Sequence, residues 1–410
     1  MSYDPYNYNR SGNKGPKIVL IILLLCVLSF VIWFVTQTDD PDRNRLAEFV
    51  DNIFGSGSPN ERSGVTNKIE LRGTCYYYQQ LSEYERQAYE SLYISCENGI
   101  SETMINPIVP EEFDRALYAL RCDHPEFFWM HGVVNTTLMN GSVYKAYCAI
   151  PPDAGDKMAQ MDKKAEEILK NAPKSDYDIV KYIYEYIINN TEYDLNAPDN
   201  QTAYSALING SSVCAGYANA FLFLCDKAGI YCGYVSGNVV GRGPHAWNFV
   251  KINGNYYWVD VTWGDPVFLD DPMFLNDSAR ADNLNYDYFC VTDKEIMTDR
   301  QITAVPAFLY PQCVDNSLNY YINAGIYFMS YDKDTIYDYL MDKVGLEGKR
   351  EIELKFATEI DYRKAVADLF DSPDYWTAFN RDIKNKYGIF FSQRMGTMYD
   401  KSYKLKIELR

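Results

Sequence analysis

An Asn-Gly pair at positions 253 and 254 separates two runs of β-prone residues, 244–252 and 255–263. Asn-Gly is the dipeptide that most strongly favours a two-residue turn between antiparallel strands. In such a turn Ile252 lies opposite Asn255, and the register of every other pair follows from that one. The sequence therefore predicts a β-hairpin with a fixed pairing, which requires an antiparallel sheet in this part of the chain.

The predicted register places a histidine and an aspartate on one face of the hairpin. His245 lies opposite Thr262 and Trp247 lies opposite Asp260, and side chains alternate between the two faces along a strand. His245, Trp247 and Asp260 therefore share a face, and Asp260 is the diagonal neighbour of His245. Asp265, the other nearby carboxylate, has the opposite parity. Taken alone, His245 and Asp260 can also be explained as half-buried, hydrogen-bonded strand residues.

A cysteine precedes this hairpin at a predicted helix start. The segment Ser211-Ser212-Val213-Cys214 favours Ser212 as the N-cap of a helix that Gly229 closes. A thiol in the first turn lies near unpaired backbone N–H groups and the positive end of the helix dipole, and both favour a thiolate. The same N–H groups can hold an oxyanion. A cysteine near a helix start can also be purely structural.

Cysteine, histidine and aspartate together form the set that nucleophilic catalysis uses. A Cys214 thiolate would attack a carbonyl group, His245 would hold the proton and deliver it to the leaving group, and Asp260 would orient the imidazole. All three lie within about fifty residues of one another.

These residues lie in segments that resemble the transglutaminase-like superfamily, and more narrowly its bacterial, membrane-anchored branch. The matching segments are Val213-Cys214-Ala215-Gly216-Tyr217-Ala218, Gly229-Ile230, His245-Ala246-Trp247-Asn248 and Trp258-Val259-Asp260-Val261-Thr262-Trp263. The resemblance is close over 175–268, and the region from Tyr76 through 124–129 is similar to the segment that precedes the domain in such proteins. It implies a papain-like fold in which Cys214 is the nucleophile, His245 the base and Asp260 the orienting acid.

The residues that complete the cleft are less defined by the sequence. Tyr204 or Gln201, just upstream of the cysteine, could supply a side-chain partner for an oxyanion. Trp247 and Trp263 could form the walls of the cleft, or they could be core aromatic residues of the hairpin.

The N-terminus predicts a membrane anchor. Residues 18–35 carry no charge, and as a helix they just cover the hydrocarbon layer. Positive residues precede this run and three aspartates follow it, which favours a cytoplasmic tail over 1–17, a single-pass transmembrane signal anchor over 18–36 and an extracellular remainder at the cell surface. A cleaved signal peptide is the alternative, although no small-x-small cleavage site follows the apolar run.

The rest of the chain divides into a linker and three predicted domains. The sequence predicts a linker over 37–67, a small α+β domain over 68–150, a catalytic domain over 151–305 and a C-terminal α/β domain over 306–410. The periodicity predicts helices at 83–96, 111–121, 154–171 and 176–190, strands at 142–150, 320–329, 350–357 and 404–409, and two further helices in the last domain. The expected class is α+β, with a papain-like, transglutaminase-like core in which a helix carrying Cys214 packs on an antiparallel sheet.

Composition excludes several functions. The chain has 39 Lys and Arg against 56 Asp and Glu, a net charge of −17, so binding to nucleic acid is not expected. With only three histidines, a multi-histidine metal site is nearly excluded, and no cofactor is expected. Nine cysteines follow the predicted anchor. If Cys214 is the nucleophile, the other eight could pair in an oxidising exterior, or several, such as Cys225, could be small buried hydrophobes.

The superfamily implies acyl transfer through a thioester. Water as the acceptor gives a cysteine protease or amidase, and an amine gives a protein-glutamine acyltransferase or transglutaminase. The expected partner is a peptide or protein substrate at the cell surface, and the sequence fixes neither this substrate nor the oligomeric state. We favour hydrolysis, because water needs no dedicated site. The alternatives are a non-catalytic, surface-anchored scaffold with the same fold and an arylamine-type acetyltransferase, which fits an exterior location poorly.

Overall fold

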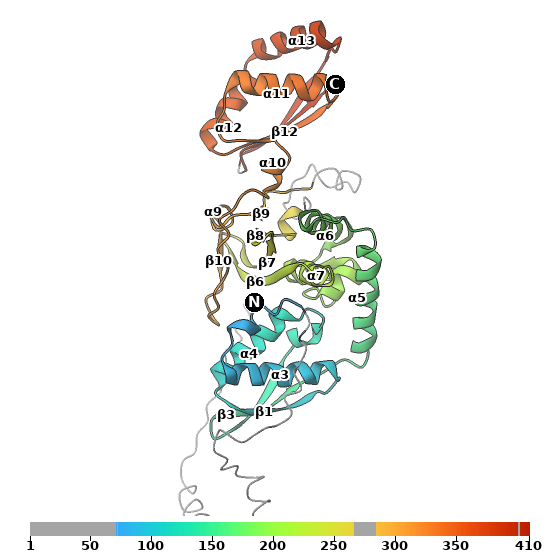
Figure 1. The fold of residues 1–410 in the computed structure, drawn as a ribbon, viewed down its shortest axis with the longest axis vertical. Helices are drawn as coiled ribbons and strands as arrows, with labels where there is room; N and C mark the ends of the chain where they lie inside the picture. The colour runs from blue at the N-terminus through green and yellow to red at the C-terminus, as the bar shows by residue number, and fades with distance from the viewer. Residues whose placement is uncertain (1–70, 72, 266–283, 401) are drawn as a thin grey trace, which may run out of the picture. The chain divides into compact units, whose positions relative to one another are not determined.

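The structure, a computed structural model, covers most of the chain beyond the predicted linker. It describes residues 71, 73–265, 284–400 and 402–410. The predicted tail (1–17), transmembrane helix (18–36) and linker (37–67) lie outside the described residues. Within the ranges described, no helix is both long enough and apolar enough to span a membrane. The elements form an α+β set on three main sheets, which confirms the predicted class (Figure 1).

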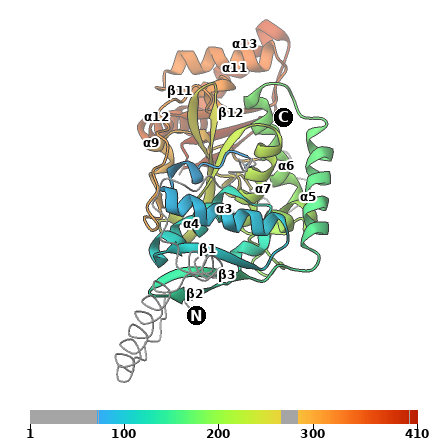
Figure 2. The ribbon, with the colours of Figure 1, turned by 60° about the horizontal axis from the view of Figure 1, so that its bottom comes forward.

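The first part of the described chain is a three-stranded antiparallel sheet with two helices. Its elements are α3 (Glu83–Glu97), β1 (Glu102–Ile108), α4 (Pro110–Asp123), β2 (Val134–Met139) and β3 (Ser142–Cys148). The strand order is β1-β3-β2, which can be followed in Figure 2. The side chains of Ser82 and Glu85 form a reciprocal capping box that begins α3. The two helices and the strand predicted here are confirmed, with ends shifted by a few residues.

The central part is a five-stranded antiparallel sheet with three long helices and the short helix α9 (Asp293–Ile296). Its elements are α5 (Ala154–Leu169), α6 (Asp176–Asn190), α7 (Cys214–Lys227), β6 (Tyr231–Val239), β7 (Gly243–Ile252), β8 (Asn255–Val259), β9 (Phe289–Val291) and β10 (Arg300–Ile302). The strand order is β10-β6-β7-β8-β9, and α7 packs on β6 and β7. A helix beginning at Cys214 therefore lies on an antiparallel sheet, as predicted. The helices predicted at 154–171 and 176–190 are also confirmed.

The predicted hairpin register is confirmed where the strands pair. Ile252 pairs with Asn255, and the ladder runs in the same register to Asn248 and Val259. The hairpin face that carries Trp247 is buried in a core cluster. Its buried members are Val235, Trp247, Phe249, Trp258, Val291, Ile296 and Cys313.

The outer end of the hairpin differs from the prediction. The strand β8 ends at Val259, so the pairs Trp247–Asp260 and His245–Thr262 do not form. The backbone N–H of Asp260 donates instead to the carbonyl of Tyr288, at 2.9 Å, and Thr262 begins a turn of 3₁₀ helix. The segment that leads into β9 thus pairs with the backbone of Asp260, which the predicted hairpin would have paired with Trp247.

The last part has a four-stranded sheet and its own apolar core. Its elements are α10 (Tyr320–Asn323), β11 (Tyr327–Phe328), α11 (Lys333–Gly345), β12 (Glu351–Phe356), α12 (Glu359–Val366), α13 (Pro373–Tyr387), β13 (Arg394–Tyr399) and β14 (Lys404–Leu409). The strand order is β11-β12-β14-β13. Strands predicted at 350–357 and 404–409 are confirmed, and three longer helices replace the two that were expected.

The strand predicted at 320–329 is wrong over most of its length. The side chain of Asn319 accepts the N–H of Tyr321 and begins the short helix α10, and Gly325, with a φ of +68°, ends it. The aromatic residues that suggested a strand serve packing instead, because Tyr320 stacks on Tyr286 with ring centroids 3.7 Å apart.

The nine cysteines of the described residues are all present as thiols. The pairing that an oxidising exterior suggested is therefore not formed in this structure. Eight of the thiols are buried, and Cys214 is partly exposed. The eight match the alternative interpretation of small buried hydrophobes.

Candidate active site

Cys214 is the first residue of α7 and lies at the positive end of that helix. The N-cap is Val213, not the predicted Ser212. The Ser212 hydroxyl donates instead to the carbonyl of Asn200, at 2.6 Å, and lies 2.6 Å from the Ser205 hydroxyl. Ser212 therefore anchors the segment before the helix and does not cap the first turn of α7.

A glycine two residues after the cysteine allows this close packing. A Cβ atom on Gly216 would lie 1.8 Å from the Ser212 hydroxyl oxygen and 2.9 Å from the carbonyl oxygens of Asn200 and Thr202. A larger residue would push the start of α7 away from the turn that holds it. The Cys-Ala-Gly sequence thus fixes where the thiol lies.

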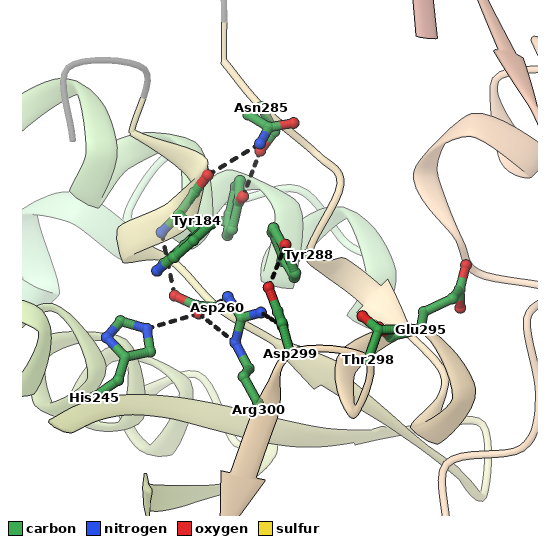
Figure 3. Close-up of polar contacts among 10 residues, drawn as sticks. Tyr184, His245, Asp260, Asn285, Tyr288, Glu295, Thr298, Asp299 and Arg300 are labelled. Atoms are coloured by element: carbon green, nitrogen blue, oxygen red, sulfur yellow. Dashed lines mark hydrogen bonds and ion pairs between the residues drawn. The ribbon is translucent and has the colours of Figure 1, made fainter. Parts of the chain in front are cut away.

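His245 lies on β7 and contacts both of its predicted partners. Its Nε2 donates to Oδ2 of Asp260 at 2.8 Å (Figure 3). It also forms a side-chain hydrogen bond with Cys214. Burial alone would lower the pKa of His245, but the Asp260 carboxylate and Cys214 outweigh it and raise this pKa to about 9. The imidazole therefore holds a proton at neutral pH.

Asp260 is fully buried and ionised. Burial alone would raise its pKa, but the positive charges of His245 and Arg300 lower it to about 2. Its Oδ2 accepts from His245 and from two N–H groups of Arg300, and its Oδ1 accepts the backbone N–H of Trp263 at 3.2 Å. The carboxylate is thus held in one orientation toward the imidazole.

Sequence reasoning missed Arg300 and Tyr193. Arg300 comes from β10, which pairs with β6 on the far side from the hairpin partner β8. The Tyr193 hydroxyl accepts the backbone N–H of Cys214, and burial is the main cause that raises the pKa of this phenol to about 12. That N–H is the group expected to bind an oxyanion. No local pattern indicates either residue, because long-range pairing brings both to the site.

The tentative cleft residues lie in different surroundings. The Tyr204 hydroxyl donates to the side chain of Gln160 at 3.0 Å, and the carbonyl of Gln201 accepts the side-chain amide of Asn219. Trp247 is fully buried and stacks on the His245 ring, so it forms part of the core.

Trp263 is partly exposed and lies edge-on to His245, with ring centroids 6.3 Å apart. Asp265, which the hairpin parity excluded, is buried and accepts the Tyr217 hydroxyl at 3.0 Å. Of Trp247 and Trp263, Trp263 is therefore the one whose side chain can line the cleft.

The segment that holds all three predicted catalytic residues matches a known family. Residues 162–262 match the model of the transglutaminase-like superfamily. The chain carries a transglutaminase-like domain. This domain covers α6, α7 and the hairpin, and the bacterial, membrane-anchored branch within the superfamily stays a prediction.

Curated relatives of the domain are the kyphoscoliosis peptidases of Homo sapiens and Mus musculus. Each is 30% identical over 120 residues, which is 25% of this chain and 18% of the relative. The chain thus matches less than a fifth of the length of these proteins.

Solved structures with a similar domain include a TGase, a candidate cysteine protease of Cytophaga hutchinsonii and the periplasmic domain of TgpA from Pseudomonas aeruginosa. The TGase is 15% identical with a TM-score of 0.25, over 31% of this chain and 43% of that one. The Cytophaga protein is 14% identical with a TM-score of 0.24, over 45% and 79%. The TgpA domain is 16% identical with a TM-score of 0.21, over 32% and 65%.

Proposed function

We propose that the protein is a thiol acyl-transfer enzyme that forms a thioester on Cys214 from a peptide bond or a glutamine-type amide. The observation that carries this proposal is the double contact of His245, which bonds Asp260 through Nε2 and also contacts the Cys214 side chain. A protonated imidazole between a carboxylate and a thiol at a helix start is the arrangement that a thiolate nucleophile needs.

The proposed reaction has two steps. The Cys214 thiolate attacks the carbonyl carbon, the C–N bond breaks, and His245 gives its proton to the leaving amine. Water then attacks the thioester, His245 takes a proton from it, the S–C bond breaks, and a carboxylic acid leaves. An amine in place of water gives a new amide by the same proton transfers. The backbone N–H of Cys214 can bind the oxyanion once its hydrogen bond to the Tyr193 hydroxyl breaks.

Hydrolysis of peptide bonds is the outcome that we favour, because water needs no binding site of its own. The substrate that we propose is a peptide or protein at the cell surface. This location depends on residues 18–36 alone, which lie outside the described residues.

The test uses the full-length protein with casein as a general acyl donor. Release of new amino groups measures hydrolysis, and incorporation of dansylcadaverine measures transamidation. We expect Cys214→Ser to abolish both and Cys148→Ser to retain them. The Cys148 thiol already donates to the carbonyl of Trp129, so a serine hydroxyl can replace it.

A burst of p-nitrophenol from p-nitrophenyl acetate tests acylation without a specific substrate. We expect a burst of one equivalent that Cys214→Ser loses. A wild-type protein that shows neither turnover of casein nor a burst contradicts the proposal and favours the scaffold alternative.

A further inference from the structure

We propose that Arg300 is a positioning residue that fixes the orientation of the Asp260 carboxylate and makes the His245–Asp260 pair release its proton more easily. This inference rests on the proposed function, because it assigns a role in the same proton transfers. It adds a fourth member, from a strand far away in the sequence, to the three residues that the family resemblance implies.

The contacts of Arg300 converge on one carboxylate oxygen. Its Nη2 and Nε donate to Oδ2 of Asp260 at 2.6 and 3.1 Å, and this is the oxygen that accepts Nε2 of His245 at 2.8 Å (Figure 3). The other oxygen, Oδ1, accepts the Trp263 backbone N–H. The carboxylate therefore has no freedom to turn away from the imidazole while the guanidinium is in place.

Arg300 is itself held rigidly. Its Nη1 donates to Asp299 at 2.6 Å, and its guanidinium carbon lies 3.9 Å from the ring centroid of Tyr288 and 4.8 Å from that of Trp263. The residue is 2% exposed. A buried cation with this many partners has few alternative positions, so it can orient the Asp260 carboxylate.

The charge of Arg300 has a second effect. Several titratable groups face the His245–Asp260 pair: Cys214 on α7, Tyr184 on α6, Tyr193 on the two-residue strand β4 (Glu192–Tyr193), and Arg300 with Asp299 beside it. A cation next to a proton-holding pair makes that pair release its proton more easily. The Asp260 carboxylate makes the imidazole hold its proton more tightly, and the charge of Arg300 offsets part of that attraction.

Two substitutions separate charge from geometry. Arg300→Gln removes the cation and keeps one donor, whereas Arg300→Lys keeps the charge and loses the paired N–H groups and the ring stacking. The titration of His245 is followed by NMR of the ¹⁵N-labelled imidazoles in the full-length protein, where three histidines give few signals. His245→Gln assigns the signal, and thermal unfolding is recorded for each variant.

We expect the midpoint of His245 to rise by about one to two pH units in Arg300→Gln. In Arg300→Lys we expect it to stay within about half a unit of the wild type. Both variants should acylate more slowly, because the carboxylate loses its orientation.

A purely structural role would lower the unfolding temperature and leave the midpoint unchanged, and that result overturns the proposal. If Arg300→Gln does not fold, Arg300→Lys still decides, because a midpoint shifted by more than a unit with the charge retained overturns it as well. The NMR titration needs no turnover. A failure of this inference is therefore distinguishable from a failure of the proposed function, which Cys214→Ser tests.

Discussion

Two clusters in this chain combine a cysteine, a histidine and a carboxylate, and they lie in very different surroundings. In the first, His245 joins Asp260 to Cys214, which is partly exposed at the start of a helix. In the second, His124 lies between Cys75 and Glu126. Its Nε2 is 3.8 Å from the sulfur, and its Nδ1 donates to the carboxylate at 2.9 Å.

The second cluster lacks what makes a thiol reactive. Cys75 is 6% exposed and His124 is 1% exposed. Burial raises the pKa of the Cys75 thiol, and the nearby Asp123 carboxylate raises it further. Cys75 also does not begin a helix, because the next element is the 3₁₀ turn Tyr78–Gln80. The same three residue types therefore give a neutral, enclosed thiol.

The residues next to the second cluster hold neighbouring segments of the chain together. Next to His124, Asp123 accepts the backbone N–H groups of Tyr77 and Tyr78, at 3.0 and 2.9 Å. The adjoining Tyr76 packs on Phe249 of β7, with ring centroids 4.6 Å apart. The comparison teaches that residue identity does not separate a candidate active site from a structural cluster, whereas exposure and the helix start do.

The largest difference between the clusters should appear in the rate of catalysis. Because Cys214 is partly exposed and Cys75 is buried, Cys214→Ser should lower kcat/KM by about 10⁴-fold or more. Cys75→Ser should leave kcat/KM unchanged in the folded protein. Steady-state kinetics on the best casein-derived peptide measure both, and equal losses would break the comparison.

The two carboxylates should differ almost as much. Asp260→Asn replaces the acceptor that stabilises the imidazolium, so kcat should fall by about 10³-fold. Glu126→Gln is the matched control at the other histidine and should retain the wild-type kcat. A control that loses activity as strongly would place the second cluster in the catalytic machinery.

Stability should show the reverse order. His124→Gln leaves Glu126 and Cys75 without their buried partner, so the free energy of unfolding should fall by about 3 kcal/mol. His245→Gln should cost less, because Arg300 still pairs with Asp260. Urea denaturation followed by fluorescence measures both. A larger loss for His245→Gln would contradict the structural role of the buried cluster.

The last comparison concerns the pH dependence of stability. Burial acts to lower the pKa of His124, but Glu126 and Cys75 raise it to about 10. A raised pKa in the folded state stabilises the protein fully below the unfolded value of about 6.5, and this contribution is lost as the pH rises toward 10. The free energy of unfolding should therefore decline over this window, and His124→Gln should make the decline shallower. An unchanged slope in that variant would show that His124 is neutral in the folded protein.

The sequence could predict what depends on local pattern. The Asn-Gly turn determined the hairpin register, and that register selected Asp260 over Asp265 as the partner of His245. The local pattern also predicts the helix start at Cys214, but it places the cap one residue too early, because Ser212 bonds across to Asn200 rather than to the helix.

Long-range pairing could not be predicted in the same way. Arg300 reaches Asp260 through a three-residue pairing of β10 with β6, and Tyr193 reaches the Cys214 N–H through a two-residue pairing of β4 with β5 (Ser211–Ser212). Such short strands carry no periodic signal. The false strand at 320–329 shows the opposite error, in which β-prone tyrosines are overridden by an Asn cap and a left-handed glycine.

The reactivity of the two thiols tests the central claim most directly. The full-length protein is treated with limiting iodoacetamide between pH 5 and 9, and the labelled cysteines are mapped by mass spectrometry, beside His245→Ala. We predict that near pH 6 Cys214 reacts roughly tenfold faster than Cys75 or more, and that it loses this advantage without His245. If Cys214 reacts no faster than Cys75, or equally fast without His245, the thiolate–imidazolium pair does not form and the account is contradicted.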